Sequence, residues 1–593
     1  MREYGSMSIN KNVQILSIEG KDLLVKNYRV NKNTLYKGSL DDSMESDKLK
    51  TVARSIIKFN KKKKRFYSND IMTVTFEYAC KGEKDLTDEE FERVESLKTT
   101  LSLLHKNQKQ EIAETKYLLK LAQRHINKRE IREQLYEHGF NIDIDGKTKH
   151  FVRYKRTSGS ARVGKCLFIN EKYAKAMIDW SFAGIKHKEG TEMDCAGMEA
   201  YISLPTSSAI DRFQLKPENI LLIDDVYSSF EDTVMATEFI NEEYDNNGNV
   251  ISGDLSTNVK TTKINNNIFD GESLLDKSIF KEKGYDDKAT LQIRNRFFKG
   301  IGVNTDIQQF FKDNNITEIS QLNGKTIATD ISQIKLITTP SSVKYLKFGS
   351  FEKWLKYIEK DWAICKYEKP QHHFNGMVQT HYQLLNTLGM SKEEMEIFLE
   401  DTINYINLLK TDVSVFKHHL GINAKAENID DIEKKEKLNT NICSTNSFIL
   451  NMLEINEDFQ NTKMCKIYKD NLINSYIKNV RKGHVLVNGN YSIIVSCPYE
   501  YLLASIGKFN GTSQLKPFEC VSSKFDNGEK LLAVRSPEPT MSNVTMLNNT
   551  RNEYIERYFN AKSKEVCYIS PIGNNIMELL SSCDFDKQNC RLA

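Results

Sequence analysis

Several features that would assign a protein to a class at once are absent from these 593 residues. No apolar run reaches the ~18 residues of a membrane-spanning helix, so we expect no transmembrane segment. No two cysteines have Cys-x-x-Cys spacing, which argues against a zinc ribbon. An odd number of cysteines without a signal peptide is typical of reduced thiols, so we expect a cytoplasmic protein. The eleven cysteines are Cys80, Cys166, Cys195, Cys365, Cys443, Cys465, Cys497, Cys520, Cys567, Cys583 and Cys590.

The net charge and the proline content are low as well. The formal net charge is only +4, so the field of the whole chain does not indicate a nucleic-acid binder, and any basic surface must be local. The nine prolines indicate no function. The hydrophobic fraction of 39% allows a sizeable core, and the length predicts ~3–4 domains.

Two carboxylates near the end of the sequence are the first candidates for chemistry. Asp584 and Asp586 stand two residues apart, after a mostly apolar stretch that begins at Met577. Two carboxylates on a tight turn can hold one Mg²⁺ beside a triphosphate. An isolated Asp-x-Asp pair is usually only a solvated turn. The residues upstream therefore decide between a solvated turn and a metal site.

An arginine follows a strand-like run upstream of this pair. The run is Leu531-Leu-Ala-Val-Arg535-Ser-Pro537. The planar guanidinium of Arg535 can fork onto ribose hydroxyls or phosphates, which a lysine cannot do in the same geometry. The order of this strand and the Asp-Phe-Asp sequence resembles the β′ subunit of multisubunit RNA polymerases. It resembles more closely the eukaryotic-type RNA-dependent RNA polymerases of RNA silencing and their single-chain relatives in Firmicutes and their phages.

Two lysine-containing segments extend the resemblance. They are Gln292-Ile-Arg294-Asn-Arg-Phe-Phe-Lys299-Gly and Pro340-Ser-Ser-Val-Lys344-Tyr. In the resembled enzymes two lysines on a double-psi β-barrel face the triphosphate. The resemblance implies this role for Lys299 and Lys344, with Lys347 as an alternative to Lys344 and with Arg294 near the substrate. A lysine considered singly is most often only a surface residue.

A basic segment begins at Phe151. It runs Phe151-Val-Arg-Tyr-Lys-Arg-Thr-Ser-Gly-Ser-Ala-Arg-Val-Gly-Lys-Cys-Leu-Phe-Ile169 and predicts a hairpin with a cationic face. It is similar to the start of the polymerase region in the resembled family, which implies that its basic residues line the barrel toward template or product. These residues are Arg153, Arg156, Arg162 and Lys165. A second basic run, from Lys61 to Arg65, is either a solvated loop or a phosphate contact.

The resulting prediction is an α+β fold. It has an α/β region over residues 1–150 and a first double-psi β-barrel-like domain over 151–350, with an insertion at 240–275. A helical connector at 351–480 leads to a second, incomplete barrel at 481–593. The insertion is rich in Asn, Thr, Gly and Asp and has a hairpin turn at Asn246-Asn-Gly. A further hairpin is predicted from Gly483 to Pro498, with its turn at Asn488-Gly489.

The resemblance implies a template-directed RNA polymerase. Asp584 and Asp586 would bind Mg²⁺, the two lysines would screen phosphate charge, and Arg535 would touch the ribose of the incoming nucleotide. The implied partners are nucleoside triphosphates and a single-stranded RNA or DNA template, which is read by base pairing rather than by the protein.

Two departures from the family pattern argue against an active enzyme. The family signature is Asp-b-Asp-Gly-Asp, with b a bulky residue, and here Lys587 and Gln588 replace the glycine and the third aspartate. Gln588 cannot contribute charge to Mg²⁺. The sequence also ends where the family continues, which predicts open barrel edges. We therefore expect little or no activity from this chain alone, or activity with a second polypeptide that completes the barrel. The alternative is a degenerate, non-catalytic relative that binds nucleic acid or nucleotide.

Overall fold

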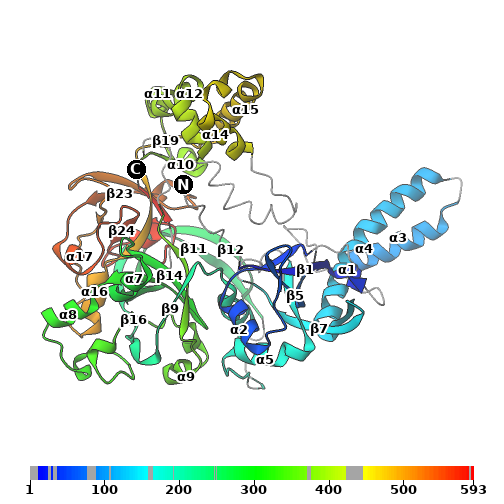
Figure 1. The fold of residues 1–593 in the computed structure, drawn as a ribbon, viewed down its shortest axis with the longest axis horizontal. Helices are drawn as coiled ribbons and strands as arrows, with labels where there is room; N and C mark the ends of the chain where they lie inside the picture. The colour runs from blue at the N-terminus through cyan, green and yellow to red at the C-terminus, as the bar shows by residue number, and fades with distance from the viewer. Residues whose placement is uncertain are drawn as a thin grey trace. The chain divides into compact units, whose positions relative to one another are not determined.

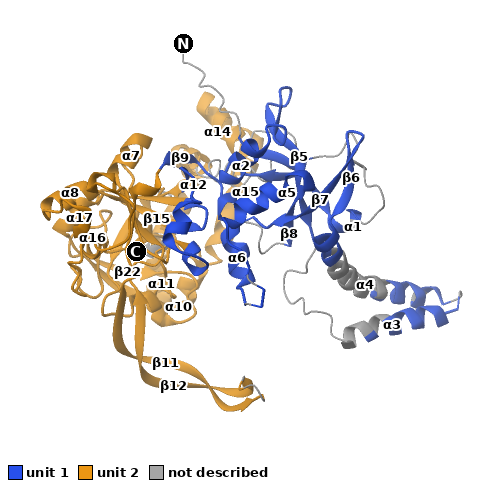
Figure 2. Cartoon of the chain, turned by 90° about the horizontal axis from the view of Figure 1, so that it is seen from below, with its two compact units in different colours: residues 1–214, 294–298, 344–365 blue, residues 215–293, 299–343, 366–593 orange. Residues whose placement is uncertain are grey.

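The structure is a computed structural model with a mixed α+β fold, as predicted (Figure 1). It describes residues 11–23, 29–30, 36–76, 88–105, 108–157, 164–187, 189–190, 192–245, 248, 250–369, 376–421, 445–585 and 589–592. The chain divides into two compact units (Figure 2). Unit 1 contains residues 1–214, 294–298 and 344–365, and unit 2 contains residues 215–293, 299–343 and 366–593.

Unit 1 is built on an eight-stranded sheet in the order β2-β6-β7-β8-β5-β1-β3, with β4 paired to β5. These strands are β1 (Val13–Glu19), β2 (Arg29–Val30), β3 (Gly38–Leu40), β4 (Lys58–Asn60), β5 (Arg65–Thr75), β6 (Phe140–Ile144), β7 (Lys147–Lys155) and β8 (Lys165–Asn170). The helices are α1 (Gly20–Leu23), α2 (Met44–Val52), α3 (Asp88–Leu103), α4 (Lys109–His138), α5 (Glu171–Phe182), α6 (Cys195–Ile202), η1 (Leu204–Thr206), η5 (Lys344–Lys347) and α9 (Phe351–Leu355). A separate strand, β9 (Asp211–Gln214), pairs antiparallel with residues 361–364.

Each face of the large sheet is covered by a hydrophobic core. Successive residues of a strand point to opposite sides of the sheet, so its central strands contribute side chains to both cores. In β8, Leu167 and Ile169 enter the core beneath α2 and α5. Cys166 and Phe168 enter the core on the opposite face, together with Leu135 of α4. A continuous apolar run such as 166–169 is what burial on two sides requires.

A buried ion pair joins β7 to α2 in unit 1. Both Glu45 and Lys155 are fully buried, and the Lys155 ammonium donates to Glu45 Oε2 at 2.5 Å. It also donates to Ser181 Oγ and to the carbonyl of Ile202, each at 3.0 Å, while the Tyr154 hydroxyl donates to the other carboxylate oxygen of Glu45. The pairing of β7 with β8 confirms the predicted hairpin. The predicted cationic face is wrong at Lys155, whose charge lies in the core.

Unit 2 contains a second sheet, in which β10, β16, β13 and β15 are neighbours in that order. Its elements are η2 (Pro217–Asn219), β10 (Ile220–Leu222), β13 (Glu272–Asp276), α7 (Lys277–Lys283), β15 (Phe298–Thr305), α8 (Ile307–Asp313), η3 (Ile319–Gln321), η4 (Ile331–Gln333) and β16 (Leu336–Thr338). The strands β14 (Thr290–Asn295) and β17 (Asp361–Tyr367) contribute residues to both units. A long two-stranded ribbon, β11 (Tyr227–Tyr244) and β12 (Val250–Asn267), precedes β13. It extends well before the insertion predicted at 240–275, and Asn246 and Asn247 of the predicted turn lie outside the described residues.

A closed six-stranded barrel forms the last part of unit 2, in the order β20-β24-β21-β23-β22-β25. Its elements are β20 (Asn490–Ser496), α16 (Pro498–Ser505), β21 (Glu519–Val521), β22 (Lys530–Val534), η8 (Met541–Asn543), β23 (Val544–Asn549), α17 (Glu553–Tyr558), β24 (Val566–Ile569), α18 (Ile576–Leu579) and β25 (Asn589–Leu592). The prediction of an incomplete barrel with open edges is wrong for the strand pairing. Strand β25 pairs with both β20 and β22 and closes the ring.

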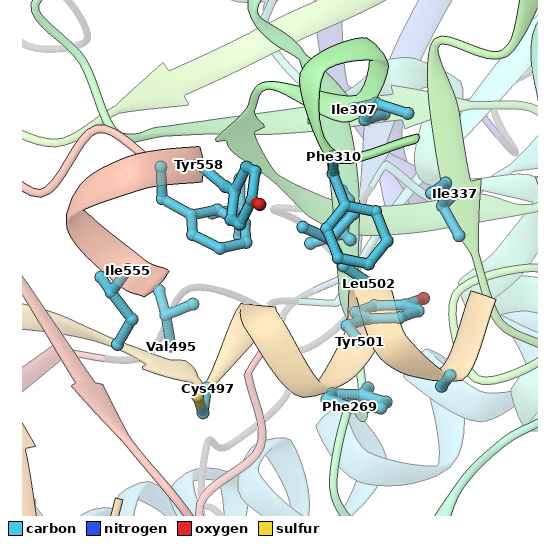
Figure 3. Packing of buried hydrophobic residues seen from close by; sticks show 14 of the residues in the cluster. Phe269, Ile307, Phe310, Ile337, Val495, Cys497, Tyr501, Leu502, Ile555 and Tyr558 are labelled. Atoms are coloured by element: carbon cyan, nitrogen blue, oxygen red, sulfur yellow. The ribbon is translucent and has the colours of Figure 1, made fainter. Parts of the chain in front are cut away.

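The barrel and the second sheet share one hydrophobic core (Figure 3). The ring of Phe269 stacks on Tyr501 of α16, with centroids 4.2 Å apart and planes at 10°. Phe310 of α8 packs edge-on against Tyr558 of α17 at 5.4 Å. Burial of several aromatic rings at one junction is a large apolar contribution, so the two sheets form one cooperative body.

Helices predominate between residues 382 and 480 of unit 2. They are α10 (Tyr382–Thr387), α11 (Lys392–Phe398), α12 (Glu400–Thr411), α14 (Thr445–Ile455), η7 (Glu457–Asn461) and α15 (Lys463–Val480). The short strands β18 (Val378–Gln379) and β19 (Leu486–Val487) pair with each other at the two ends of this region. The predicted boundary at residue 150 falls inside β7, and residues 151–214, assigned to the first barrel, lie in unit 1. Among the described residues, no helix has both the length and the hydropathy to cross a membrane.

The buried ion pair gives a stability prediction. Lys155→Ala leaves the Glu45 carboxylate buried without its cation, so we expect unit 1 to lose about 3–5 kcal/mol of unfolding free energy. Urea unfolding followed by tryptophan fluorescence measures this, because Trp180 lies against Lys155 at 5.4 Å. Lys175→Ala, which removes an exposed i,i+4 pair with Asp179, is the control and should cost less than about 0.5 kcal/mol. Equal losses for the two variants would contradict the prediction.

Candidate active site

The turn formed by residues 269–272, between β12 and β13, fastens three separate segments of unit 2 together. The amide of Phe585 donates to the carbonyl of Asp270 at 2.8 Å. The amide of Gly271 donates to Ser341 Oγ at 3.2 Å, and the carbonyl of Gly271 accepts from the amide of Ile301 at 3.0 Å. The 269–272 turn therefore contacts the loop of Asp584, the strand of Lys299 and the segment that precedes Lys344.

Lys299 is held beside this turn from its other side. Its amide donates to the carbonyl of Ser342 at 3.1 Å. Ser342 Oγ donates in turn to the carbonyl of Glu272 at 3.3 Å. Short main-chain links thus connect the strand of Lys299 to the loop of Asp584 through one turn. Ser341 and Ser342 belong to the sequence motif around residue 340, but the motif does not predict that their hydroxyl groups form these hydrogen bonds.

Asp584 stands half-buried between two buried neighbours. The side chains of Cys583 and Phe585 lie in the core of the closed barrel, and the amide of Cys583 donates to the carbonyl of Met577 at 3.0 Å. Burial raises the pKa of the Cys583 thiol to about 12, which makes this cysteine a structural apolar group rather than a nucleophile. The two flanking core residues fix the backbone on both sides of Asp584. Asp586, Lys587 and Gln588 lie outside the described residues.

Arg535 holds the turn that leads to Asp584. Its Nη1 donates to the carbonyls of Leu580 at 3.2 Å and Ser581 at 2.6 Å, and Ser581 Oγ donates back to the carbonyl of Arg535 at 3.2 Å. Ser581 and Ser582 adopt left-handed backbone angles, with φ of 57° and 51°. Such angles are unfavourable for non-glycine residues and persist where surrounding contacts enforce them. The guanidinium predicted to touch ribose here supports the loop itself.

Two buried glutamates lie between the second sheet and the barrel, and sequence reasoning missed both. Glu272 is fully buried; its Oε2 accepts from the amide of Ser496 at 2.9 Å, while its Oε1 has no partner among the described residues. Glu500 of α16 is also fully buried and accepts from the amide of Gln514 at 3.0 Å. Burial raises the pKa of Glu500 to about 7 and raises that of Glu272 well above its ordinary value. A single Glu in an apolar stretch has no local pattern that could have revealed this.

The other predicted substrate residues belong to unit 1. Arg294 is buried, and Lys344 is half-buried at the start of η5. The Lys347 ammonium donates to the hydroxyl of Tyr201 at 2.9 Å and lies 5.4 Å from the centre of its ring. The structure does not distinguish between the two alternatives, Lys344 and Lys347.

The predicted nucleic-acid residues also lie in unit 1. The Arg153 guanidinium donates to the Glu199 carboxylate and covers the ring of Tyr136 at 4.7 Å. The ion pair neutralises much of its charge. Lys165 is exposed at the start of β8, the amide of Arg156 points to Glu199 at 3.5 Å, and Arg162 lies outside the described residues.

The described residues do not by themselves form a magnesium site. In this part of the chain, no three Asp, Glu, His or Cys side chains come together in a group that could hold a metal ion. Of the acidic pair near the end of the sequence, only Asp584 has a described position. We therefore derive no reaction step through a bound metal.

Comparison with known proteins gives a fold but no family. No protein-family model and no curated protein matches the chain. Among solved structures, it is similar to the RNA-dependent RNA polymerase QDE-1 from Thielavia terrestris, with a TM-score of 0.52 and 13% sequence identity. The match covers 91% of this chain and 52% of that chain, so the chain spans about half of its length. The two share a fold, which agrees with the resemblance seen in the sequence.

The buried Glu500 predicts a pH dependence of stability. Its pKa is raised from 4.5 to about 7 in the folded state, so between these values the folded protein binds more protons than the unfolded chain. Stability therefore falls as pH rises from about 4.5 to 7, by up to about 3 kcal/mol from this group. Urea unfolding from pH 5 to 8 should show a smaller fall in Glu500→Gln. The exposed Glu556→Gln should leave the profile unchanged, and an unchanged profile in Glu500→Gln would contradict the prediction.

The support of the Asp584 loop by Arg535 is testable by hydrogen exchange. Arg535→Ala removes two hydrogen bonds to the carbonyls of residues 580 and 581, so the amides of Cys583 and Phe585 should exchange at least about tenfold faster. Lys530→Ala, an exposed change at the start of β22, the strand that precedes Arg535, is the matched control. Equal exchange in the two variants would mean that the loop does not need the guanidinium.

Proposed function

We propose that the chain is a template-directed RNA polymerase polypeptide of the two-barrel type and that unit 2 carries its nucleotidyl-transfer site. The observation that carries the proposal is the 269–272 turn, which fastens the strand of Lys299 and the loop of Asp584 within one unit. The fold shared with an RNA-dependent RNA polymerase supports the same reading. The chain spans about half of that protein, so the whole activity is part of the proposal.

The roles follow from the positions of the groups. Asp584, together with Asp586, would hold Mg²⁺, which would neutralise triphosphate charge. Lys299 would contact phosphate from the neighbouring strand; Lys344 belongs to unit 1, so the proposed site in unit 2 does not include it. Arg535 would act indirectly, since its guanidinium holds the loop of Asp584. The substrates would be nucleoside triphosphates on a single-stranded RNA or DNA template, and the closed barrel would be of the double-psi type.

A second candidate function is a non-catalytic relative that binds single strands or nucleotides. The observation that favours it is Gln588, which occupies the position of the third carboxylate in the resembled signature. The described strands of the barrel pair in a closed ring, so open barrel edges no longer argue against activity. A second polypeptide that completes the enzyme stays part of the proposal. We attribute the weak activity that we expect to Gln588.

Restoring the third carboxylate separates the two candidates. We expect low Mg²⁺-dependent nucleotide incorporation by the isolated chain on single-stranded RNA or DNA, and an increase of about 10–100-fold in Gln588→Asp, because the added charge strengthens metal binding. Gln588→Asn is the matched control and should give no increase. Asp584→Asn should abolish the gain, whereas Asp526→Asn, an exposed change elsewhere in the barrel domain, should keep it.

The two candidate functions predict different results for these variants. No incorporation by Gln588→Asp, with binding of single strands retained, would favour the non-catalytic relative. Incorporation that is insensitive to Asp584→Asn would contradict the proposed site.

A further inference from the structure

The ribbon of β11 and β12 is the feature of unit 2 that the proposed site does not use. Each strand has 18 residues, so the ribbon is about 60 Å long at about 3.3 Å per residue. Figure 2 shows it leaving unit 2 as two paired strands. No other strand of the described residues pairs with either of its edges. An isolated two-stranded hairpin is only marginally stable in water, and a long open edge is a template for another strand.

The base of the ribbon is hydrogen-bonded to the rest of unit 2. The amide of Gly573 donates to Ser228 Oγ at 2.9 Å, and Asn575 Nδ2 donates to Asp232 Oδ2 at 2.6 Å. Beyond this base, one face carries four exposed apolar side chains. They are Met235 (74% exposed), Phe239 (54%), Leu255 (69%) and Val259 (69%). They are cross-strand neighbours, since Met235 lies opposite Val259 and Phe239 lies opposite Leu255.

The two edges of the ribbon differ in charge. Strand β11 contains no lysine or arginine, and its acidic residues would repel a second β11; they are Glu231, Asp232, Glu238, Glu242 and Glu243. Strand β12 carries one acid, Asp254, and two bases, Lys260 and Lys263. Asp254 and Lys260 stand at equal distances on either side of Thr257, and so do Leu255 and Val259. The β12 edge is therefore complementary to itself when one copy is reversed.

We infer that β12 pairs antiparallel with β12 of a second copy of this chain, centred on Thr257, so that two ribbons form a four-stranded sheet. In this register Asp254 lies opposite Lys260 of the partner subunit, and Leu255 lies opposite Val259 of the partner subunit. The two-fold axis repeats both pairs. The contact is isologous, as in most homodimers.

The charges select this register over its neighbours. In an antiparallel pair, residues that lie opposite each other point to the same face of the sheet. The pairing of β12 with a second β12 can therefore change register only in ways that keep opposite side chains on the same face. The next register on either side places Asp254 opposite Asn258 or Thr262, with no charge pair. Within each ribbon Asn241 Nδ2 donates to Asp254 at 3.1 Å and Lys260 pairs with Glu238, so both charges contact β11 and would have to be shared with, or turned toward, the partner's β12.

The pairing also joins the apolar residues of the two ribbons. On one face of the four-stranded sheet the order across the strands is Phe239, Leu255, the partner's Val259 and the partner's Met235, and the two-fold axis generates a second such row. Cross-strand apolar and opposite-charge pairs are the units that stabilise a sheet. The open main-chain groups of β12 gain partners at the same time.

Sedimentation equilibrium of the full chain tests the inference. The wild type should form dimers, and Asp254→Lys or Lys260→Asp should each weaken dimerisation about tenfold or more, because each variant places like charges opposite each other twice. An equimolar mixture of the two variants should restore dimers, since each then presents the charge that the other lacks. The double variant Asp254→Lys/Lys260→Asp should also dimerise.

Glu243→Lys is the matched control, because it makes a similar charge change on the β11 edge and should leave dimerisation unchanged. Circular dichroism of every variant excludes loss of the fold as the cause. A wild type that stays monomeric at ~100 µM would overturn the inference. So would dimers that neither reversal weakens, or a mixture that fails to restore them, which would indicate an interface elsewhere.

Discussion

The architecture of unit 2 depends on one main-chain constraint, the 269–272 turn. It accepts the amide of Phe585, which follows Asp584, and it is tied through Ser342 to the amide of Lys299. Most of these links use backbone groups, so they survive extensive change of side chains. Backbone links of this kind are compatible with a fold that is shared at only 13% identity. Glu272, at the end of the turn, adds a buried carboxylate whose Oε2 accepts from the amide of Ser496 and so reaches the barrel.

The hydrophobic core around the 269–272 turn also joins parts of unit 2 that are distant in the sequence. The aromatic contacts between Phe269 and Tyr501 and between Phe310 and Tyr558 make the second sheet and the barrel one body. Within this body Arg535 supports the turn before Asp584, while Cys583 and Phe585 anchor the loop in the barrel core. A loop held by buried residues on both sides of Asp584 restricts this carboxylate without a bound ligand, and under the proposed function this would be the preorganisation that charge stabilisation requires.

Local patterns in the sequence predict short strands and loops, but not the partners of those strands. The segments that contain Lys299, Arg535 and Asp584 lie in one compact unit, whereas Lys344 lies in the other. The hairpin predicted from Gly483 to Pro498 is wrong: β19 pairs with β18, and β20 enters the barrel beside β24 and β25. Such pairings are set by distant partners that no local pattern specifies. For the same reason the alternating pattern of the 151–169 hairpin predicts a cationic face, although a carboxylate 110 residues away pairs with Lys155 in the core.

The central claim is that Lys299 and the loop of Asp584 contact one triphosphate. Equilibrium binding of a ribonucleoside triphosphate to the full chain, in the presence of Mg²⁺, tests it most directly because it does not require turnover. We predict that Lys299→Met weakens binding at least about tenfold, since a phosphate contact by a charged group contributes more than 1 kcal/mol. Lys312→Met, on the nearby helix α8, should have no effect. Equal binding by the wild type and Lys299→Met would contradict the account.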